Sequence, residues 1–136
     1  MTTSDEIVLR ARSIFGDRLR GIFAFGSRIA GGARTDSDLD LGVWLDGPFR
    51  RRDSWIPWIA EFEREEPPID PTFLTDASLE APGAWLLEGV HGGVEILFDP
   101  TGRLGTRLGQ IRSAIDRGHY RRKLFMGLPY YATEPS

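Results

Sequence analysis

Apolar positions in the first part of the chain change from a helical spacing to a strand-like one. Thr3 followed by Glu6 is typical of a helix start, and apolar residues then recur every three or four positions up to Gly21. Two strand-like runs follow at residues 22–25 and 39–45. This pattern predicts one helix packed on a sheet that contains both runs.

The rest of the chain continues the alternation of helices and strands. Asp53 or Ser54 is expected to cap a helix that runs to Glu66, with Pro57 in its first turn. The remaining predicted elements are a strand at 69–74, a helix at 84–88 ended by Gly89, a strand at 94–98 and a helix from Thr101 to Gly118. With no internal repeat, the pattern predicts an α/β (α+β) domain: a small mixed β-sheet with helices packed mainly on one face.

The segment between the first two predicted strands carries the strongest chemical signal. Gly26 and Ser27 follow an apolar run, and ten residues later Asp38 and Asp40 form a D-x-D pair. Strand alternation points both aspartates to the same side. Adjacent carboxylates repel unless a cation lies between them, and hard oxygen ligands suit Mg²⁺ that bridges to a substrate's phosphates. Because a glycine turn lets backbone amides approach a phosphate, the segment predicts joint binding of phosphate and metal.

Two familiar loops with similar residues are excluded by their own requirements. A calcium loop needs glycine where Leu41 stands and glutamate where Gly47 stands. A P-loop needs lysine and a hydroxyl residue at the positions of Gly32 and Ala33. The remaining alternative is a glycine-rich turn followed by a strand whose aspartates face water.

The spacing of these residues resembles the signature of the minimal nucleotidyltransferases, which belong to the DNA polymerase beta superfamily. That pattern is Gly-Ser, ten residues and D-x-D, and Gly26, Ser27, Asp38 and Asp40 match it without a gap. The segment 85–100 resembles the family's later region, where a helix ends in glycine and a strand ends in aspartate. The resemblance implies the nucleotidyltransferase fold and the transfer of a nucleoside monophosphate to a hydroxyl group.

The resemblance also implies a third metal-binding carboxylate on a neighbouring strand, and Asp70 is our candidate. It lies in a short β-prone run after a helix, where the family keeps its third acid. Other aspartates fit turns or helix starts better: Asp46, Asp76 and Asp99. Three prolines near Asp70 lack a backbone donor and place its strand at a sheet edge or a bulge: Pro67, Pro68 and Pro71.

The site implied by the resemblance therefore combines metal and nucleotide binding. Two Mg²⁺ ions and ATP, or another nucleoside triphosphate, are the expected cofactor and substrate. The expected catalytic and metal-binding residues are Asp38, Asp40 and Asp70, and the expected nucleotide-binding residues are Gly26, Ser27, Arg28 and Arg34.

Length and charge restrict the acceptor. The chain has 136 residues, which predicts one domain with no room for a second, acceptor-binding domain. A net charge of −3 argues against extended binding to nucleic acid. There is no cysteine, and no segment suggests a signal peptide or a membrane span, so we expect a cytoplasmic protein. The acceptor is then a small molecule or a partner protein.

The resemblance suggests which partner this is. Stand-alone minimal nucleotidyltransferases are commonly antitoxins that adenylylate a tyrosine of a helical, ribonuclease-type toxin. Two alternatives stay open. One is a non-catalytic antitoxin or binding module with a vestigial nucleotide site. The other is a nucleotidyltransferase that modifies a small molecule such as an antibiotic, with a homo-oligomer completing the acceptor pocket.

A change in composition near residue 118 divides the predicted nucleotidyltransferase domain, 1–118, from a C-terminal tail, 119–136. The tail opens with Arg121, Arg122 and Lys123 and continues with apolar and aromatic residues. This composition is typical of an arm that docks on a partner, or of a segment that packs back on its own domain.

Overall fold

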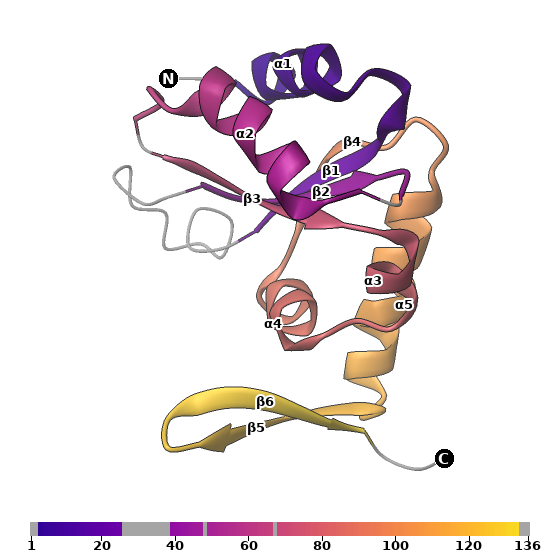
Figure 1. Ribbon diagram of the computed structural model, residues 1–136. Helices are drawn as coiled ribbons and strands as arrows, with labels where there is room; N and C mark the ends of the chain where they lie inside the picture. The colour runs from indigo at the N-terminus through magenta and orange to yellow at the C-terminus, as the bar shows by residue number, and fades with distance from the viewer. Residues whose placement is uncertain (1–2, 26–38, 48, 67, 134–136) are drawn as a thin grey trace.

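The structure, a computed structural model, describes residues 3–25, 39–47, 49–66 and 68–133, and a four-stranded sheet forms its centre (Figure 1). The strands are β1 (Leu19–Phe25), β2 (Leu39–Leu45), β3 (Ile69–Leu74) and β4 (Glu95–Phe98), in the order β3-β2-β1-β4. Strand β1 pairs antiparallel with β2 and β4, whereas β2 pairs parallel with β3. The predicted mixed sheet is confirmed, and β3 lies at its edge, as the prolines around Asp70 indicated.

Helices cover both faces of this sheet rather than mainly one (Figure 1). On one face lie α1 (Ser4–Phe15) and α2 (Arg51–Phe62), and on the other lie α3 (Asp76–Glu80), α4 (Ala84–Gly92) and α5 (Arg103–Asp116). The reason lies in the central strands, where residues 21–25 and 41–45 are buried without a break. A strand whose consecutive residues are all buried needs cover on both faces of the sheet, because successive side chains point to opposite faces.

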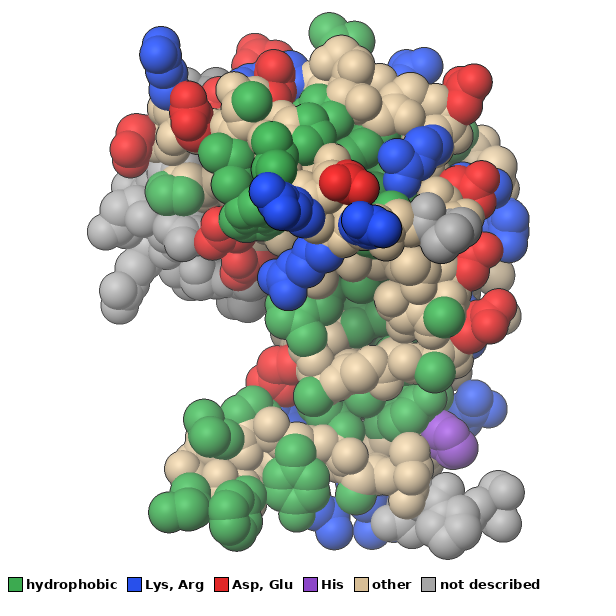
Figure 2. Space-filling view, viewed as in Figure 1, with side chains coloured by type: hydrophobic (Ala, Val, Ile, Leu, Met, Phe, Trp, Pro, Cys, Tyr) green, Lys and Arg blue, Asp and Glu red, His purple; other side chains and the backbone are tan. Residues whose placement is uncertain are grey.

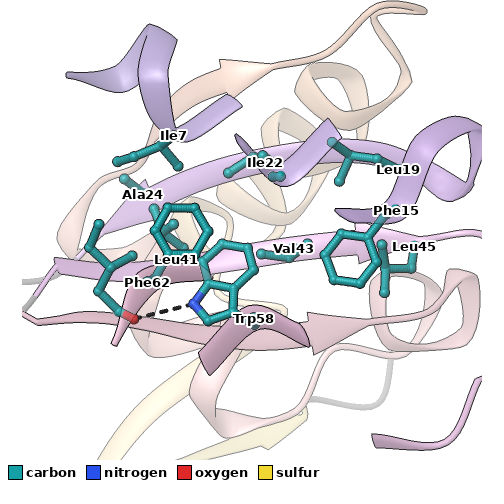
Figure 3. Close-up of a cluster of buried hydrophobic side chains, with 12 residues drawn as sticks. Ile7, Phe15, Leu19, Ile22, Ala24, Leu41, Val43, Leu45, Trp58 and Phe62 are labelled. Atoms are coloured by element: carbon teal, nitrogen blue, oxygen red, sulfur yellow. Dashed lines mark hydrogen bonds between the residues drawn. The ribbon is translucent and has the colours of Figure 1, made fainter. Parts of the chain in front are cut away.

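The face under α1 and α2 holds a core of aromatic and branched side chains (Figure 3). Trp58 of α2 is 1% exposed, stacks on Phe15 of α1 with ring centroids 6.4 Å apart, and contacts Phe62. Its indole N–H donates to the carbonyl of Ile69 at 3.4 Å, which ties α2 to the start of β3. The core therefore fixes the edge strand that carries Asp70.

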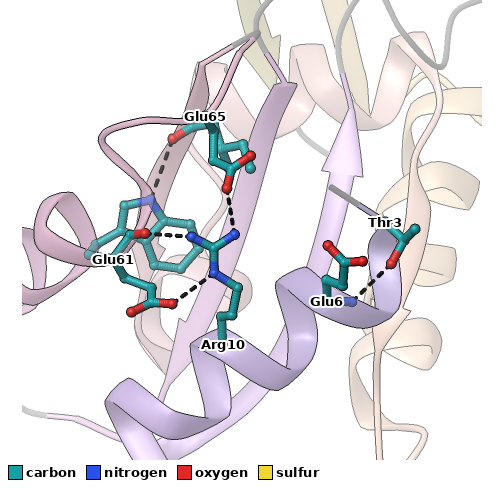
Figure 4. A network of polar contacts seen from close by, with 7 residues as sticks. Thr3, Glu6, Arg10, Glu61 and Glu65 are labelled. Carbon is teal, nitrogen blue, oxygen red and sulfur yellow. Dashed lines mark hydrogen bonds and ion pairs between the residues drawn. The ribbon is translucent and has the colours of Figure 1, made fainter. Parts of the chain in front are cut away.

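A polar contact joins α1 to the end of α2 at the rim of this core (Figure 4). The Arg10 guanidinium donates from Nε to Glu61 at 2.7 Å and from Nη1 to Glu65 at 2.5 Å. The same guanidinium lies over the Phe62 ring, 4.4 Å from its centroid. Arg10 thus holds the two helices together on one side of the sheet.

Some helix boundaries agree with the predicted ones, and others differ from them. Thr3 caps α1 as predicted, because its hydroxyl accepts the N–H of Glu6 at 3.2 Å. Helix α2 begins earlier than predicted, after Arg50, which makes no side-chain cap, and it ends at Phe62 with Pro57 inside it. Helix α3 is capped by Thr75, one residue before the expected Asp76. Helix α4 runs past Gly89 to Gly92.

The tail contains an element that the sequence interpretation missed. Residues 120–133 form an antiparallel hairpin of β5 (Tyr120–Phe125) and β6 (Leu128–Thr133), which lies beyond α4 and outside the main sheet (Figure 1). Met126 and Gly127 connect the strands with φ angles of 51° and 81°. Two central residues with positive φ are typical of the tight turn that matches strand twist. The sequence signal for this hairpin was the Met126–Gly127 pair between two β-prone runs.

No helix in the described part of the chain is both long enough and apolar enough to cross a membrane.

Candidate active site

The structure places two of the three predicted carboxylates side by side. Asp40 is the second residue of β2, and the parallel register pairs it with Asp70 of β3. Neighbouring strands lie about 4.8 Å apart, so the two side chains leave adjacent points of the sheet. On the other side of β2, Asp40 pairs with Phe25, the last residue of β1. The other predicted site residues lie outside the described residues: Gly26, Ser27, Arg28, Arg34 and Asp38.

Asp40 and Asp70 also share one face of the sheet. Side chains alternate along a strand, so Asp40 projects on the same side as Trp44, and Asp70 on the same side as Leu74. Trp44 and Leu74 are both buried against the helices α3 to α5. Asp40 therefore projects from the face that α4 covers. Asp70 leaves the edge strand on the same side by alternation, and it also lines a smaller hollow with Trp55 and Trp58 of α2.

A hollow of about 440 Å³ opens on this face beside Asp40. It lies between the sheet, α4 and the hairpin, on a side where the surface is deeply concave (Figure 2). Its lining residues are Phe25, Asp40, Ala84, Trp85, Glu88, Gly89, Gly92 and Pro129. The volume suits a small-molecule moiety or one protruding side chain, and the mixture of apolar walls with few polar groups is typical of a binding site.

Close packing of α4 on the end of β1 builds the aromatic wall of the hollow. The rings of Phe25 and Trp85 meet edge to face with centroids 4.4 Å apart. A Cβ atom at Gly89 would lie 2.9 Å from the Phe25 ring, so glycine is required for this approach. Trp85 remains 38% exposed, which leaves part of its ring surface free to contact a ligand.

Glu88 of α4 anchors the hairpin at the far side of the hollow. Its carboxylate accepts Nε and Nη2 of Arg122 at 2.9 and 2.8 Å, and the hydroxyl of Tyr131 at 2.7 Å. The hydrogen bonds from Arg122 are the main cause that lowers the pKa of Glu88 to about 2; burial opposes them, and the hydrogen bond from Tyr131 lowers the pKa further. Burial, and then the bond to Glu88, raises the pKa of Tyr131.

Sequence reasoning did not single out these wall and anchor residues. Phe25, Trp85, Glu88 and Pro129 come from three separate segments and meet only because α4 and the hairpin pack together. The basic and aromatic composition of the tail partly indicated the contact with Glu88, since Arg122 and Tyr131 both come from the tail.

A second hollow of about 390 Å³ lies at the opposite end of β2, beside Trp44. Two arginines border it, and Arg107 donates its Nε to the carbonyl of Leu79 at 2.7 Å. Neither Asp40 nor Asp70 lines it. Because the two hollows are similar in size, the chemistry of their linings distinguishes them, and of these two only the first is lined by a predicted carboxylate, Asp40.

Two of the predicted metal ligands lie among the described residues. Asp40 and Asp70 offer hard oxygen donors from adjacent strands, which is the ligand type that Mg²⁺ prefers. Among the residues that the structure describes, no group of three or more histidine, cysteine or acidic side chains is placed to hold a metal ion. The third predicted ligand, Asp38, lies outside that part of the chain.

The described part of the chain thus holds a mixed sheet in which Asp40 and Asp70 lie near the starts of the parallel strands β2 and β3. No protein-family model matches the sequence, and no curated protein matches it. Solved structures do match. A toxin–antitoxin complex with AMP-PNP matches with a TM-score of 0.57 at 16% identity, over 85% of this chain and 88% of that one.

Two further matched structures are also toxin–antitoxin complexes. One is the complex of a tri-AMPylated Shewanella oneidensis HEPN toxin with an MNT antitoxin, with a TM-score of 0.53, 15% identity and 84% of both chains covered. The other is the MntA–HepT toxin–antitoxin complex, with a TM-score of 0.51, 13% identity, and 84% of this chain and 86% of that one covered. The chain therefore has the fold of the minimal nucleotidyltransferase antitoxins, which confirms the predicted fold.

Proposed function

We propose that this chain is a magnesium-dependent nucleotidyltransferase that transfers AMP from ATP to a tyrosine hydroxyl of a partner toxin, and so acts as the antitoxin of a two-gene system. The parallel register of Asp40 and Asp70 beside a hollow is the observation that carries the proposal. Two matched structures add support by their content, since one contains AMP-PNP and another contains a tri-AMPylated toxin.

Each proposed site residue has a distinct role. Asp38, Asp40 and Asp70 hold the Mg²⁺ ions, with Asp70 nearest the acceptor. Gly26, Ser27, Arg28 and Arg34 bind the triphosphate through backbone amides, a hydroxyl and positive charge. The bound metal supplies charge neutralisation at the phosphates and lowers the pKa of the acceptor hydroxyl.

The proposed reaction is an in-line displacement at the α-phosphorus of ATP. The acceptor oxygen forms a bond to this phosphorus, its proton passes to Asp70, and the bond to the β-phosphate oxygen breaks. Pyrophosphate leaves, and its charge is stabilised by Ser27 and the nearby arginines. The adenylyl group is never attached to the enzyme, so catalysis consists of positioning and electrostatics.

The modification explains how the partner is inactivated. An AMP group adds bulk and negative charge to the toxin. Near a ribonuclease site, that charge repels the phosphates of RNA and the bulk blocks access. The hollow beside Asp40 is large enough for one protruding side chain, which fits a tyrosine acceptor.

Mass spectrometry tests the proposal directly. The purified chain is incubated with Mg²⁺, ATP and the product of the neighbouring gene, and the intact mass of that product is measured. We expect an increase of one or more AMP units, which EDTA abolishes. An unchanged mass for each neighbouring gene product would contradict the proposal.

A further inference from the structure

The hairpin carries an apolar surface that its own domain leaves uncovered. Register pairs Arg122 with Tyr131, and both contact Glu88, so this pair faces the body of the domain. The adjacent pairs, Lys123 with Tyr130 and Phe125 with Leu128, then lie on the opposite face. We call Lys123, Phe125, Met126, Leu128 and Tyr130 the docking face.

The exposure of these side chains is high for apolar residues. Phe125 is 68% exposed, Leu128 is 70% exposed and Met126 at the turn is 88% exposed. Figure 2 shows apolar side chains gathered at the free end of the hairpin. Contiguous exposed apolar side chains mark interaction sites more often than isolated ones do.

The backbone at Met126 strengthens this inference. Its φ of 51° is the left-handed conformation, which favours glycine or asparagine and costs other residues about 1–2 kcal/mol. Here a methionine occupies that position and exposes 88% of its surface, so local stability does not explain the choice of residue. Methionine adapts its shape well to a partner surface.

The docking face lies next to the candidate active site along the hairpin. Leu128 of the docking face precedes Pro129, which lines the hollow together with Asp40, although the two side chains project from opposite faces of the hairpin. Figure 1 shows the turn of the hairpin projecting to the side where β1 ends and β2 begins, and Asp40 is near the start of β2. A protein bound to the turn would therefore reach the mouth of the hollow.

Charge indicates what kind of molecule binds. The whole chain has a net charge of −3, whereas residues 119–133 contain three basic residues and no acidic one. A second copy of the chain would bring Lys123 of one hairpin against the same basic face of the other in a two-fold dimer. RNA would meet mainly apolar side chains at the turn and an acidic body behind it. A protein with an apolar depression and an acidic border fits the docking face best.

We infer that the docking face of the hairpin binds the acceptor protein and directs its target hydroxyl into the hollow beside Asp40. This inference rests on the proposed function, because it names the element that recognises the acceptor. It assigns the hairpin a role in binding and none in the chemical step.

Two variants test the inference without disturbing the fold. Met126→Asn removes the apolar side chain at the turn and introduces a residue that accepts positive φ, so the hairpin is retained. Leu128→Gln removes an apolar side chain that is 70% exposed, and Leu9→Gln is its matched control, because Leu9 of α1 is 68% exposed. Melting temperatures of all three variants are compared with that of the unmodified chain.

Binding to the neighbouring gene product is measured by calorimetry without ATP. We expect Met126→Asn and Leu128→Gln each to weaken the Kd roughly tenfold, as loss of an interface anchor does, and Leu9→Gln to leave it unchanged. An unchanged Kd in both hairpin variants would overturn the inference, as would absence of binding by the unmodified chain. It would also be overturned if the substitutions abolished self-association in sedimentation or binding to a single-stranded RNA oligonucleotide instead.

The two proposals fail in different ways. If hairpin-dependent binding is found but the bound protein never gains AMP, the transfer chemistry is wrong and the docking face stands. If AMP transfer proceeds at the normal rate and KM in both hairpin variants, the docking face is wrong and the proposed function stands.

Discussion

Single residues carry the proposed chemistry and set the tightest packing of this domain. Asp40 and Asp70 are adjacent on two parallel strands although they are far apart in the sequence. Gly42 follows Asp40 by two residues on β2, and it packs against the ring of Phe23 on β1. Each of these positions supports a specific prediction.

Replacing either carboxylate with its amide is expected to stop AMP transfer while leaving the fold intact. Asp40→Asn and Asp70→Asn should each lower the transfer rate about a hundredfold or more, because an amide keeps the shape but loses the charge that binds metal. The measurement is AMP incorporation into the partner. Asp17→Asn is the control, since Asp17 is exposed and precedes the opposite end of β1. Normal transfer by the double variant Asp40→Asn with Asp70→Asn would refute the site.

Two glycine-to-alanine substitutions should change stability in opposite directions. At Gly42 a Cβ atom would fall within the Phe23 ring, whose side chain is fully buried, so Gly42→Ala should destabilise the domain by about 3 kcal/mol. At Gly109, inside α5, a Cβ atom has nothing within 4 Å. There alanine should stabilise the helix by up to about 1 kcal/mol. Urea unfolding followed by tryptophan fluorescence measures both, and equal stabilities would contradict the packing.

At the level of elements, sequence patterns predicted the sheet strands well and helix ends less well. Strands β2 and β3 match their predicted ranges of 39–45 and 69–74, because alternation and flanking turns are local signals. Helix α2 begins and ends earlier than predicted, since packing of Trp58 and Phe62 sets its length rather than a capping residue. The hairpin was missed, because its strands pair with each other and expose most of their side chains.

The attachment of this hairpin to α4 should depend on pH. The folded-state pKa of Glu88 is about 2, below its ordinary value of 4.5, so its contribution to stability is complete above pH 4.5. The contribution is lost as pH falls from 4.5 towards 2. We expect the difference in unfolding free energy between the unmodified chain and Glu88→Gln to be constant at neutral pH and to shrink over that acidic range.

Arg122→Gln provides the second arm of this experiment. It removes the main cause of the lowered pKa of Glu88, so it should flatten the acidic pH dependence much as Glu88→Gln does. Urea unfolding at a series of pH values measures both. A difference between Glu88→Gln and the unmodified chain that stays constant down to pH 2 would show that Glu88 does not anchor the hairpin.

For the whole molecule, the open question between an active enzyme and a vestigial nucleotide site has a direct test. An active site should be stabilised when Mg²⁺ and a non-hydrolysable ATP analogue are both present, and much less by either one. At a ligand concentration about 100 times the Kd, the gain is about 2.7 kcal/mol, which raises the melting temperature by several degrees. Differential scanning fluorimetry measures this, and Asp40→Asn should abolish the shift. No shift in the unmodified chain would favour a non-catalytic binding module.

The amino-acid sequence by itself determined the strands of the mixed sheet and the main helices packed on it, because periodicity, caps and flanking turns act between neighbours in sequence. The register that sets Asp70 beside Asp40, the helices on both faces, and the hollow between α4 and the hairpin arise from contacts between distant segments. Such contacts depend on how side chains of several elements fill space together, and no single stretch of residues encodes that.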